Sequence, residues 1–325
     1  MATHFARVSA LTPKYTDMIK RTLYFGNPAY LSLKDCQMVI RIPEIIKADL
    51  PELFESKTTK TTPVEDIGIV VLDNKQITIT HGLMEALLEN NCSVITCDSS
   101  RMPVGLMLPL CGHTTQNERF RYQIEASLPL KKQLWQQTIQ AKIKNQAKVL
   151  LGHGCIVNNM LVWAYKVKSG DTENLEARAA AYYWKNVFPF IEKFYRDRNG
   201  LPPNNLLNYG YAILRAIIAR ALVSSGLLPT LGIHHHNRYN AYCLADDIME
   251  PYRPYVDKLV IDIILSGEDY TKLSTSVKAK LLSIPVLDVI IDGNRKPLMI
   301  AASTTTASLA KCFEGELRKI LYPEM

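Results

Sequence analysis

The period of the hydrophobic pattern changes near residue 108, and this change constrains the fold more than any other feature of the chain. Before it, short apolar runs either alternate with polar residues or stay continuous, as in β-strands. After it, apolar residues recur at helical spacing. We therefore predict an α+β protein, with a β-rich domain over residues 18–108 and a larger all-α domain over residues 109–325. Residues 1–17 carry no clear periodicity and are predicted to form a loose extension.

The same pattern predicts the individual elements. Strands are expected over residues 38–42, 67–72, 76–80 and 94–97, with a short helix over 83–89. The run 67–72 is continuous and β-branched, which indicates a central strand. The polar tract 55–62 has no apolar anchor and is predicted to be a flexible loop. Longer helices are expected over 117–151, 175–195, 206–228, 241–264 and 274–283.

Composition excludes two classes of protein. With 47% hydrophobic and 21% charged residues, the chain must bury a core, so a disordered chain is excluded. The seven cysteines form an odd set without a CxxC pair, which argues against a zinc ribbon or a disulfide framework. A reducing, cytoplasmic setting fits this cysteine usage best. The net charge of +7 permits a polyanionic partner but is weak evidence for nucleic acid.

We predict no membrane segment. The longest apolar stretch, Leu206 to Leu228, contains Arg215 and Arg220 in its middle. A charge near the centre of a spanning helix costs about 2.5–3.5 kcal/mol on insertion scales, so this stretch is predicted to be a buried helix of a globular domain. The N-terminal residues lack the apolar core that a secretory signal needs.

Three groups of residues in the helical half are candidates for chemistry. A histidine triplet, 234–236, follows Gly232, and Asp247 and Glu250 lie one helical turn apart. Glu176 begins an alanine-rich helix. Taken singly, each group also has an explanation without chemistry. The histidines can be a surface run, Asp247 and Glu250 can be a solvated acidic face, and Glu176 can be a partner of the helix dipole. Taken together, they supply one imidazole and two or three carboxylates, a set suited to Mg²⁺ or Mn²⁺.

Longer segments carry a resemblance to a known family. Residues 231–237, LGIHHHN, are followed by Tyr239-Asn240 and by 244–254, LADDIMEPYRP. Together with Asn174-Leu175-Glu176 they resemble the Cas1 family of CRISPR adaptation integrases. The opening RTLYFGNPAYLSLK, from Arg21, looks like the first hairpin of Cas1 proteins from type II systems. The resemblance covers nearly all of residues 18–325.

The resemblance implies a metal site. The family's ligands fall on Glu176, His235 and Glu250, which should converge on one Mg²⁺ or Mn²⁺ at about 2.0–2.3 Å. Asp247 matches an acidic position close to the metal in several members and is a candidate base for the attacking hydroxyl. A partner for the other ring nitrogen of His235 is expected, with Asn240 as the candidate. The family commonly has Gly after the first glutamate, where this chain has Ala177.

The resemblance also implies partners. Cas1 proteins join the 3′-hydroxyl of a DNA fragment to a phosphodiester in the CRISPR repeat, so contacts to DNA phosphates are expected. Candidates for these contacts are Arg253, Arg178 and Asn240. A looser basic group, which is equally a solvated helix face, comprises Lys131, Lys132, Lys142, Lys144 and Lys148. A homodimer built by the β-rich domain, at an edge strand near 67–72 or 77–80, is expected, as are a small Cas2-like protein and, in a type II system, Cas9.

Three alternatives stay open from the sequence. A metal-dependent nuclease that cuts DNA without joining it would use the same ligands. A non-catalytic DNA-binding scaffold would need neither Glu176 nor Glu250. A dimerisation or assembly protein would have no role on DNA, and its net charge of +7 would be incidental.

Overall fold

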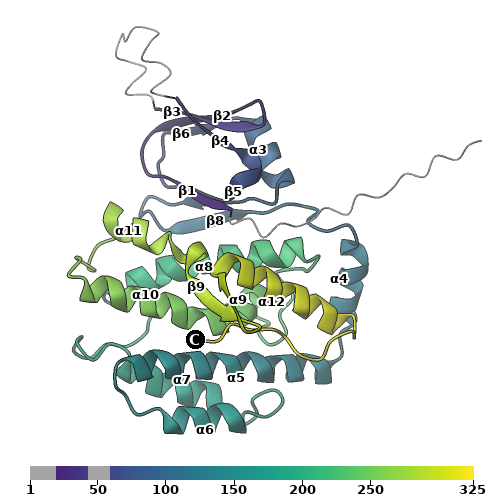
Figure 1. Cartoon of the computed structure of the whole chain (residues 1–325), viewed down its shortest axis with the longest axis vertical. Coiled ribbons are helices and arrows are strands. Elements are labelled where there is room, and N and C mark those ends of the chain that lie inside the picture. Colours follow the sequence, from purple (N-terminus) through teal and green to yellow (C-terminus); the bar gives the residue numbers. More distant parts are fainter. Residues whose placement is uncertain (1–19, 43–58) are drawn as a thin grey trace, which may run out of the picture.

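A computed structural model describes residues 20–42 and 59–325. The predicted extension over 1–17, and residues 55–58 of the predicted loop, lie outside the described residues. Two sheets are stacked at one end of the molecule, and the helices form the rest of it (Figure 1). The fold class predicted from the hydrophobic pattern is therefore confirmed: a β-rich N-terminal part precedes a larger helical part.

Each sheet has four strands among the described residues. The inner sheet, next to the helices, has the order β1-β5-β7-β8, with bounds Arg21–Phe25, Ile67–Leu72, Ser93–Cys97 and Pro103–Met107. The outer sheet has the order β4-β3-β2-β6, with bounds Thr59–Pro63, Gln37–Arg41, Ala29–Lys34 and Ile77–Ile79. Helix α3 (His81–Glu89) packs beside them, and a small apolar core lies between the two sheets.

Strand β5 joins the two halves of the molecule. Ile67 and Val70 lie in the core of the β-rich part, whereas Ile69 and Val71 belong to the large core of the helical part. A strand that is buried on both faces needs a continuous apolar run, which is what the sequence has here. The prediction of a central strand is confirmed, and the prediction that residues 67–72 lie at an edge is wrong because β1 and β7 flank β5. Strand β6 is an edge strand.

Two further predictions for this region are corrected by strand pairing. Residues 59–62, predicted as loop, belong to β4, whose backbone pairs with β3 and whose Thr62 is buried. The segment from Arg21 does not form one hairpin, because β1 pairs with β5 and β2 pairs with β3 and β6. The hairpin is β2–β3, closed by Asp35 and Cys36 with φ of 49° and 58°, the pattern of a type I′ turn.

The helical part is built around α8 (Asn204–Ser224), with α4 at one side and α5, α6 and α7 at the end far from the sheets (Figure 1). The predicted helix over 117–151 is two helices, because the chain turns at Ala126 and Ser127 caps the second one. The predicted helix over 241–264 is likewise divided, by a 3₁₀ turn, η2. A short hairpin, β9–β10, adds strands to a domain predicted as all-α. The bounds are α4 Gln116–Glu125, α5 Leu128–Gly152, α6 Asn158–Lys166, α7 Leu175–Asn186, α9 Cys243–Met249, η2 Glu250–Tyr252, α10 Arg253–Leu265, α11 Thr275–Leu281, η3 Ile284–Val286, β9 Asp288–Ile291, β10 Asn294–Pro297 and α12 Leu298–Phe313.

Helix α8 accounts for the long apolar stretch with two arginines. Among the described residues it is the one helix long and apolar enough to pass a test for a membrane span, and 83% of its apolar window is buried inside the protein. Arg220 donates a hydrogen bond to the carbonyl of Asn91, and Arg215 pairs with Asp246. Both charges thus have partners in the fold, as buried or half-buried charges require.

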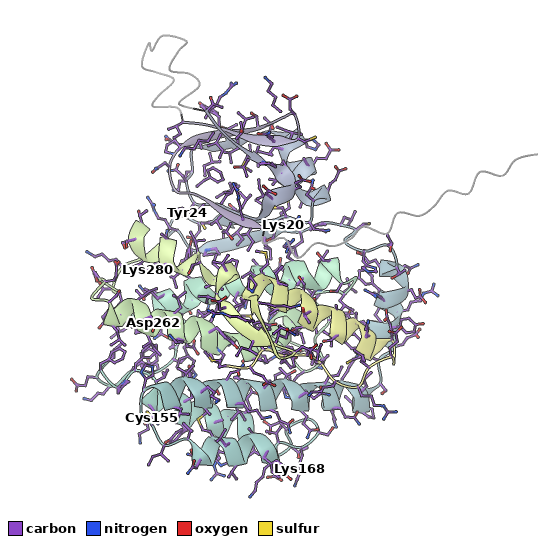
Figure 2. All side chains as sticks on the ribbon, in the orientation of Figure 1. Lys20, Tyr24, Cys155, Lys168, Asp262 and Lys280 are labelled. Atoms are coloured by element: carbon purple, nitrogen blue, oxygen red, sulfur yellow. The ribbon has the colours of Figure 1, made fainter. Side chains whose placement is uncertain are left out.

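A buried ion pair connects the inner sheet to helix α11. Lys278 Nζ lies 2.6 Å from Asp73 Oδ2, and the two side chains are 1% and 0% exposed. The hydroxyl of Tyr24 on β1 donates a second hydrogen bond to the same carboxylate. In Figure 2, Tyr24 on the sheet and Lys280 on α11 mark the two sides of this junction. Because neither charge reaches water, each depends on the other.

We predict that Lys278→Met destabilises the protein by about 3–5 kcal/mol, because it leaves the Asp73 carboxylate buried without its cation. Denaturant unfolding measures the change. Lys280→Met, on the exposed side of the same helix, is the matched control and should change stability little. The double variant Asp73→Leu/Lys278→Met should recover most of the loss, and a double variant as unstable as Lys278→Met would contradict this account.

Candidate metal and DNA site

Glu176 and Glu250 meet at one lysine. Glu176 lies in the first turn of α7, where Asp171 accepts hydrogen bonds from the backbone N–H of Leu175 and Glu176, each at 2.9 Å. Glu250 begins η2 and is 4% exposed. Lys142 Nζ lies 2.7 Å from Glu176 Oε1 and 2.7 Å from Glu250 Oε2. The two carboxylates, 74 residues apart in the chain, therefore face a common point.

The position of Lys142 corrects the sequence interpretation. It was grouped with lysines that form either a solvated face or a DNA contact, but it is buried within helix α5. Burial alone would lower the pKa of Lys142, yet the charges of Glu250 and Glu176 raise it. In the same way, burial alone would raise the pKa of Glu250, and the charges of Arg253 and Lys142 hold it below its usual value. Lys142 and Glu250 are thus charged near neutral pH.

The histidine triplet lies in a loop of residues 232–236, which we call the histidine loop. This loop is held by Asp247. Its carboxylate is fully buried and accepts from the backbone N–H of Ile233, His234 and His235 at 2.7, 2.9 and 3.3 Å. A Cβ at Gly232 would lie 2.8 Å from Asp247 Oδ2 and 2.4 Å from the carbonyl oxygen of His235. The loop can wrap this closely because residue 232 is glycine.

The imidazole of His235 is oriented by the same carboxylate. His235 Nδ1 lies 2.5 Å from Asp247 Oδ1, so in the neutral ring Nδ1 carries the proton and Nε2 carries the lone pair. This hydrogen bond raises the pKa of His235, and the charges of Glu250 and Glu176 act in the same direction. Because both oxygens of Asp247 are engaged, it is a positioning residue, and the role of base predicted for it is not supported.

Asn240 is not the partner of His235. Its side-chain amide donates to Asp246 Oδ2 at 2.7 Å, and Arg215 pairs with the same carboxylate at 2.7 and 3.0 Å. The prediction of Asn240 beside the imidazole is therefore wrong, and Asp247 takes that position. The amide of Asn240 instead connects the segment before α9 to Asp246 on that helix.

Helix α5 supplies functional neighbours that the sequence analysis missed. Trp135 stacks on His234, with ring centroids 4.1 Å apart and an interplanar angle of 1°, and its edge meets His235 at 5.6 Å. Asn145 donates hydrogen bonds to the carbonyls of Pro251 at 2.8 Å and Pro323 at 3.0 Å, which fixes the turn after Glu250. Polar and apolar residues are mixed along α5, so the sequence alone does not show which side of the helix packs inward.

Arg253, predicted to contact a DNA phosphate, is half-buried and paired with Glu250. Its Nη2 lies 3.2 Å from Glu250 Oε1, and its guanidinium lies 5.1 Å from the ring centre of Tyr211. Tyr211 and Tyr183 donate to the two oxygens of Asp257, at 2.5 and 2.8 Å. Burial raises the pKa of Asp257 to about 6. Arg253 thus pairs with Glu250, and its side chain is still 30% exposed.

The other predicted DNA contacts lie nearer the surface. Arg178 is exposed on α7, with its guanidinium 5.2 Å from the ring centre of Trp163. Lys132, Lys144 and Lys148 are exposed, and Lys131 is half-buried. Ala177, the departure from the family pattern, is exposed in the first turn of α7.

The residues present fit a divalent cation. Glu250 Oε2 is buried and has no well-directed hydrogen bond from any described residue, although Lys142 Nζ lies 2.7 Å away. An oriented imidazole with its lone pair on Nε2 and two carboxylates form a donor set for Mg²⁺ or Mn²⁺. As the side chains stand, no three His, Cys, Asp or Glu within residues 20–42 and 59–325 are close enough to bind one ion. Lys142 takes the place between the two carboxylates.

The fold and the site together define an α+β protein whose helical part brings two glutamates to one lysine and holds a histidine loop on a buried aspartate. The family model described as "CRISPR associated protein Cas1" matches residues 24–277. The chain therefore belongs to the Cas1 family.

Relatives and solved structures agree with this assignment. The CRISPR-associated endonuclease Cas1 of Neisseria meningitidis serogroup C is 37% identical over 311 residues, 95% of this chain and 97% of the relative. A casposase bound to its integration product matches the fold with a TM-score of 0.73 at 19% identity, over 92% of each chain. A chain of a Cas6-RT-Cas1–Cas2 complex matches with a TM-score of 0.69 at 20% identity, over 98% of this chain and 36% of that chain.

We predict that Asp247→Asn lowers the pKa of His235, because the imidazolium loses the carboxylate that favours it. Titration of the histidine resonances by NMR measures the shift. The variant should also lose about 1.5–3 kcal/mol of stability, since an amide cannot accept all of the hydrogen bonds at this position. Because the folded-state pKa of His235 is raised, the stabilisation from the pair is complete below about pH 6.5 and fades as the pH rises through the folded-state value.

Asp262→Asn is the control for this variant, because Asp262 is an exposed carboxylate paired with Lys258 on α10. The Asp262→Asn variant should leave the pKa of His235 unchanged. An Asp247→Asn protein in which His235 titrates as in the unmodified chain would contradict the positioning role of Asp247.

Proposed function

We propose that this protein is a CRISPR adaptation integrase, a metal-dependent DNA endonuclease and strand transferase that inserts short DNA fragments into the CRISPR repeat array. One observation carries the proposal. In a chain of the Cas1 family, Glu176 and Glu250 face one point at Lys142 Nζ, and His235 is oriented by Asp247, three residues before Glu250 in the chain. A carboxylate–imidazole centre of this kind suits phosphodiester chemistry with a divalent cation.

Glu176, His235 and Glu250 would hold the cation, Mg²⁺ or Mn²⁺. When bound, it polarises the scissile phosphate and stabilises the charge that develops there. The chain's own residues prepare this site. Asp247 keeps the lone pair of His235 on Nε2, and Arg253 keeps Glu250 ionised in a buried position. The attacking group is the 3′-hydroxyl of the DNA fragment in joining, or water in cutting.

DNA would bind through its phosphates, because an integrase of this kind must accept fragments of varied sequence. Arg178 and the exposed lysines of α5 are the candidates that can reach them, and Asn240 is a weaker one because Asp246 engages its amide. Arg253 is a less direct probe of phosphate binding than Arg178, since replacing it also leaves Glu250 without a partner. We extend the proposal to a Cas2-like partner and to Cas9 in a type II system.

Three other functions are the alternatives to this one. A nuclease that cuts without joining would use the same ligands and differ in the nucleophile that reaches the phosphate. A scaffold without catalysis would have no need for buried carboxylates around a common point, because burying them costs stability unless each is paired. A pure assembly protein would have no need of them either. The site geometry therefore favours an enzyme.

We predict that Glu250→Gln abolishes the joining of DNA 3′-ends to a repeat-containing duplex, with a loss of about 10²-fold or more. The amide keeps the shape of the side chain and removes one charge that the cation needs. Duplex binding should persist or tighten, because a negative charge near phosphate is removed. The joining of labelled fragments in Mg²⁺ or Mn²⁺, and duplex binding in the same buffer, are the two measurements.

Glu173→Gln is the matched control, since Glu173 is an exposed glutamate three residues before Glu176 and pairs with Lys168. It should join DNA at the unmodified rate, and Glu176→Gln should behave like Glu250→Gln. Full joining by both site variants would overturn the integrase proposal in favour of the scaffold. Cutting without joining by the unmodified protein would favour the nuclease.

We further propose a homodimer built by the β-rich part, at edge strand β6 and the outer sheet beside it. Tyr30 on β2 pairs in register with Thr78 on β6 and is 48% exposed, a large apolar side chain at that edge. An edge strand with unpaired backbone groups favours pairing with a second copy.

Sedimentation at micromolar concentration should therefore give a dimer, and Tyr30→Lys should shift it toward monomer. Tyr165→Lys is the control, because Tyr165 is 87% exposed on α6, far from the sheets. A monomer at that concentration, or a dimer indifferent to both substitutions, would count against this surface.

A further inference from the structure

Lys142 occupies the point at which a cation between Glu176 and Glu250 would be expected. Its Nζ is 2.7 Å from one oxygen of each carboxylate, so those two oxygens are separated by no more than twice that distance. The side chains of Lys142, Glu250 and Glu176 are 10%, 5% and 24% exposed, so water screens the contact with Glu250 little and the contact with Glu176 somewhat more. The ammonium therefore places a positive charge between the two carboxylates, as a bound cation would.

The cluster is already neutral with Lys142 in place. Two carboxylates, Glu176 and Glu250, are matched by two cations, Lys142 and Arg253. A divalent cation added in the gap would stand beside the Lys142 ammonium in a mostly buried space, where like charges at short distance repel strongly. Either Lys142 leaves the gap, or a further anion joins the cluster.

We propose that Lys142 competes with the divalent cation for the gap between Glu176 and Glu250, and that a DNA phosphate relieves this competition by pairing with the displaced ammonium. The inference rests on the proposed function, since it takes DNA as the anion. A lysine suits this role because its flexible four-carbon stem lets the ammonium move while the backbone of α5 stays in place. Lys142 is in this view a positioning residue.

The competition couples two binding events. If the ammonium finds a phosphate, the gap is free for the cation, so DNA raises the affinity for metal, and metal raises the affinity for DNA by the same factor. A site of this kind stays weakly loaded until DNA is present. Binding of Mn²⁺ to the protein alone, and to the protein with a short duplex, therefore reports on Lys142 without any measurement of catalysis.

The experiment is a calorimetric titration with Mn²⁺, with and without the duplex. In the unmodified protein the duplex should tighten Mn²⁺ binding, within the usual coupling range of about 5–150-fold. Lys142→Met should bind Mn²⁺ about tenfold more tightly than the unmodified protein when no DNA is present, and the duplex should add little. Lys144→Met is the matched control, because Lys144 is exposed on the same helix and its loss removes the same charge. Its Mn²⁺ affinity without DNA should equal that of the unmodified protein.

Two further variants keep the proposal testable if Lys142→Met folds poorly. Lys142→Gln is neutral but can donate hydrogen bonds to the carboxylates, and it should also tighten Mn²⁺ binding. Lys142→Arg keeps a cation and should retain the weak affinity of the unmodified protein. In EDTA, the neutral variants should melt at lower temperature than the unmodified protein, and Mn²⁺ should raise their melting temperature by more. These responses together separate competition from a merely structural role.

Neutral variants that fold but bind Mn²⁺ no more tightly than Lys144→Met would overturn the inference. If the unmodified protein still joined DNA, that failure would leave the proposed function intact. Tighter Mn²⁺ binding by the neutral variants, in a chain that never joins or cuts DNA, would support the competition at this gap and overturn the proposed function instead.

Discussion

Three carboxylates buried within one short segment are the constraint on which the helical domain depends. Asp246, Asp247 and Glu250 are at most 8% exposed, and a carboxylate removed from water must be paired or hydrogen-bonded. Each is satisfied by a different part of the chain. Arg215 on α8 pairs with the first, the histidine loop donates to the second, and Lys142 on α5 contacts the third. The packing of these elements around α9 and η2 meets all three requirements at once.

This constraint also gives the site many contacts inside the protein that hold its residues in position. The backbone of the histidine loop is tied to a carboxylate that cannot reach water, and Trp135 covers one histidine face. The turn after Glu250 is held by Asn145. A Cas1 protein proposed to join two DNA ends has to place reacting groups accurately, and side chains locked by packing and hydrogen bonds provide that accuracy. In the competition that we propose, the long side chain of Lys142 is the part of the site that moves.

Much of the fold was predictable where the signal is local. The continuous run 67–72 and the apolar stretch of α8 were recognisable because a strand or helix buried all round needs an unbroken apolar sequence. Residues 59–62 were not recognisable as a strand, since their threonines pair in a sheet whose apolar side is supplied by neighbours. The pairing of β1 with β5 was also hidden, because it joins segments that are remote in the chain.

The sequence by itself determined the identity of the reactive groups. The spacing of Asp247 and Glu250, the triplet after Gly232 and the glutamate at a helix start are local patterns, and they pointed to the Cas1 family and to one candidate centre. Only the tertiary structure decided which of these side chains lie next to one another. Lys142 is 34 residues from Glu176 in the chain, and its inward direction depends on which face of α5 packs against η2. Such long-range placement follows from the burial of the whole domain, and no local pattern of residue types encodes it.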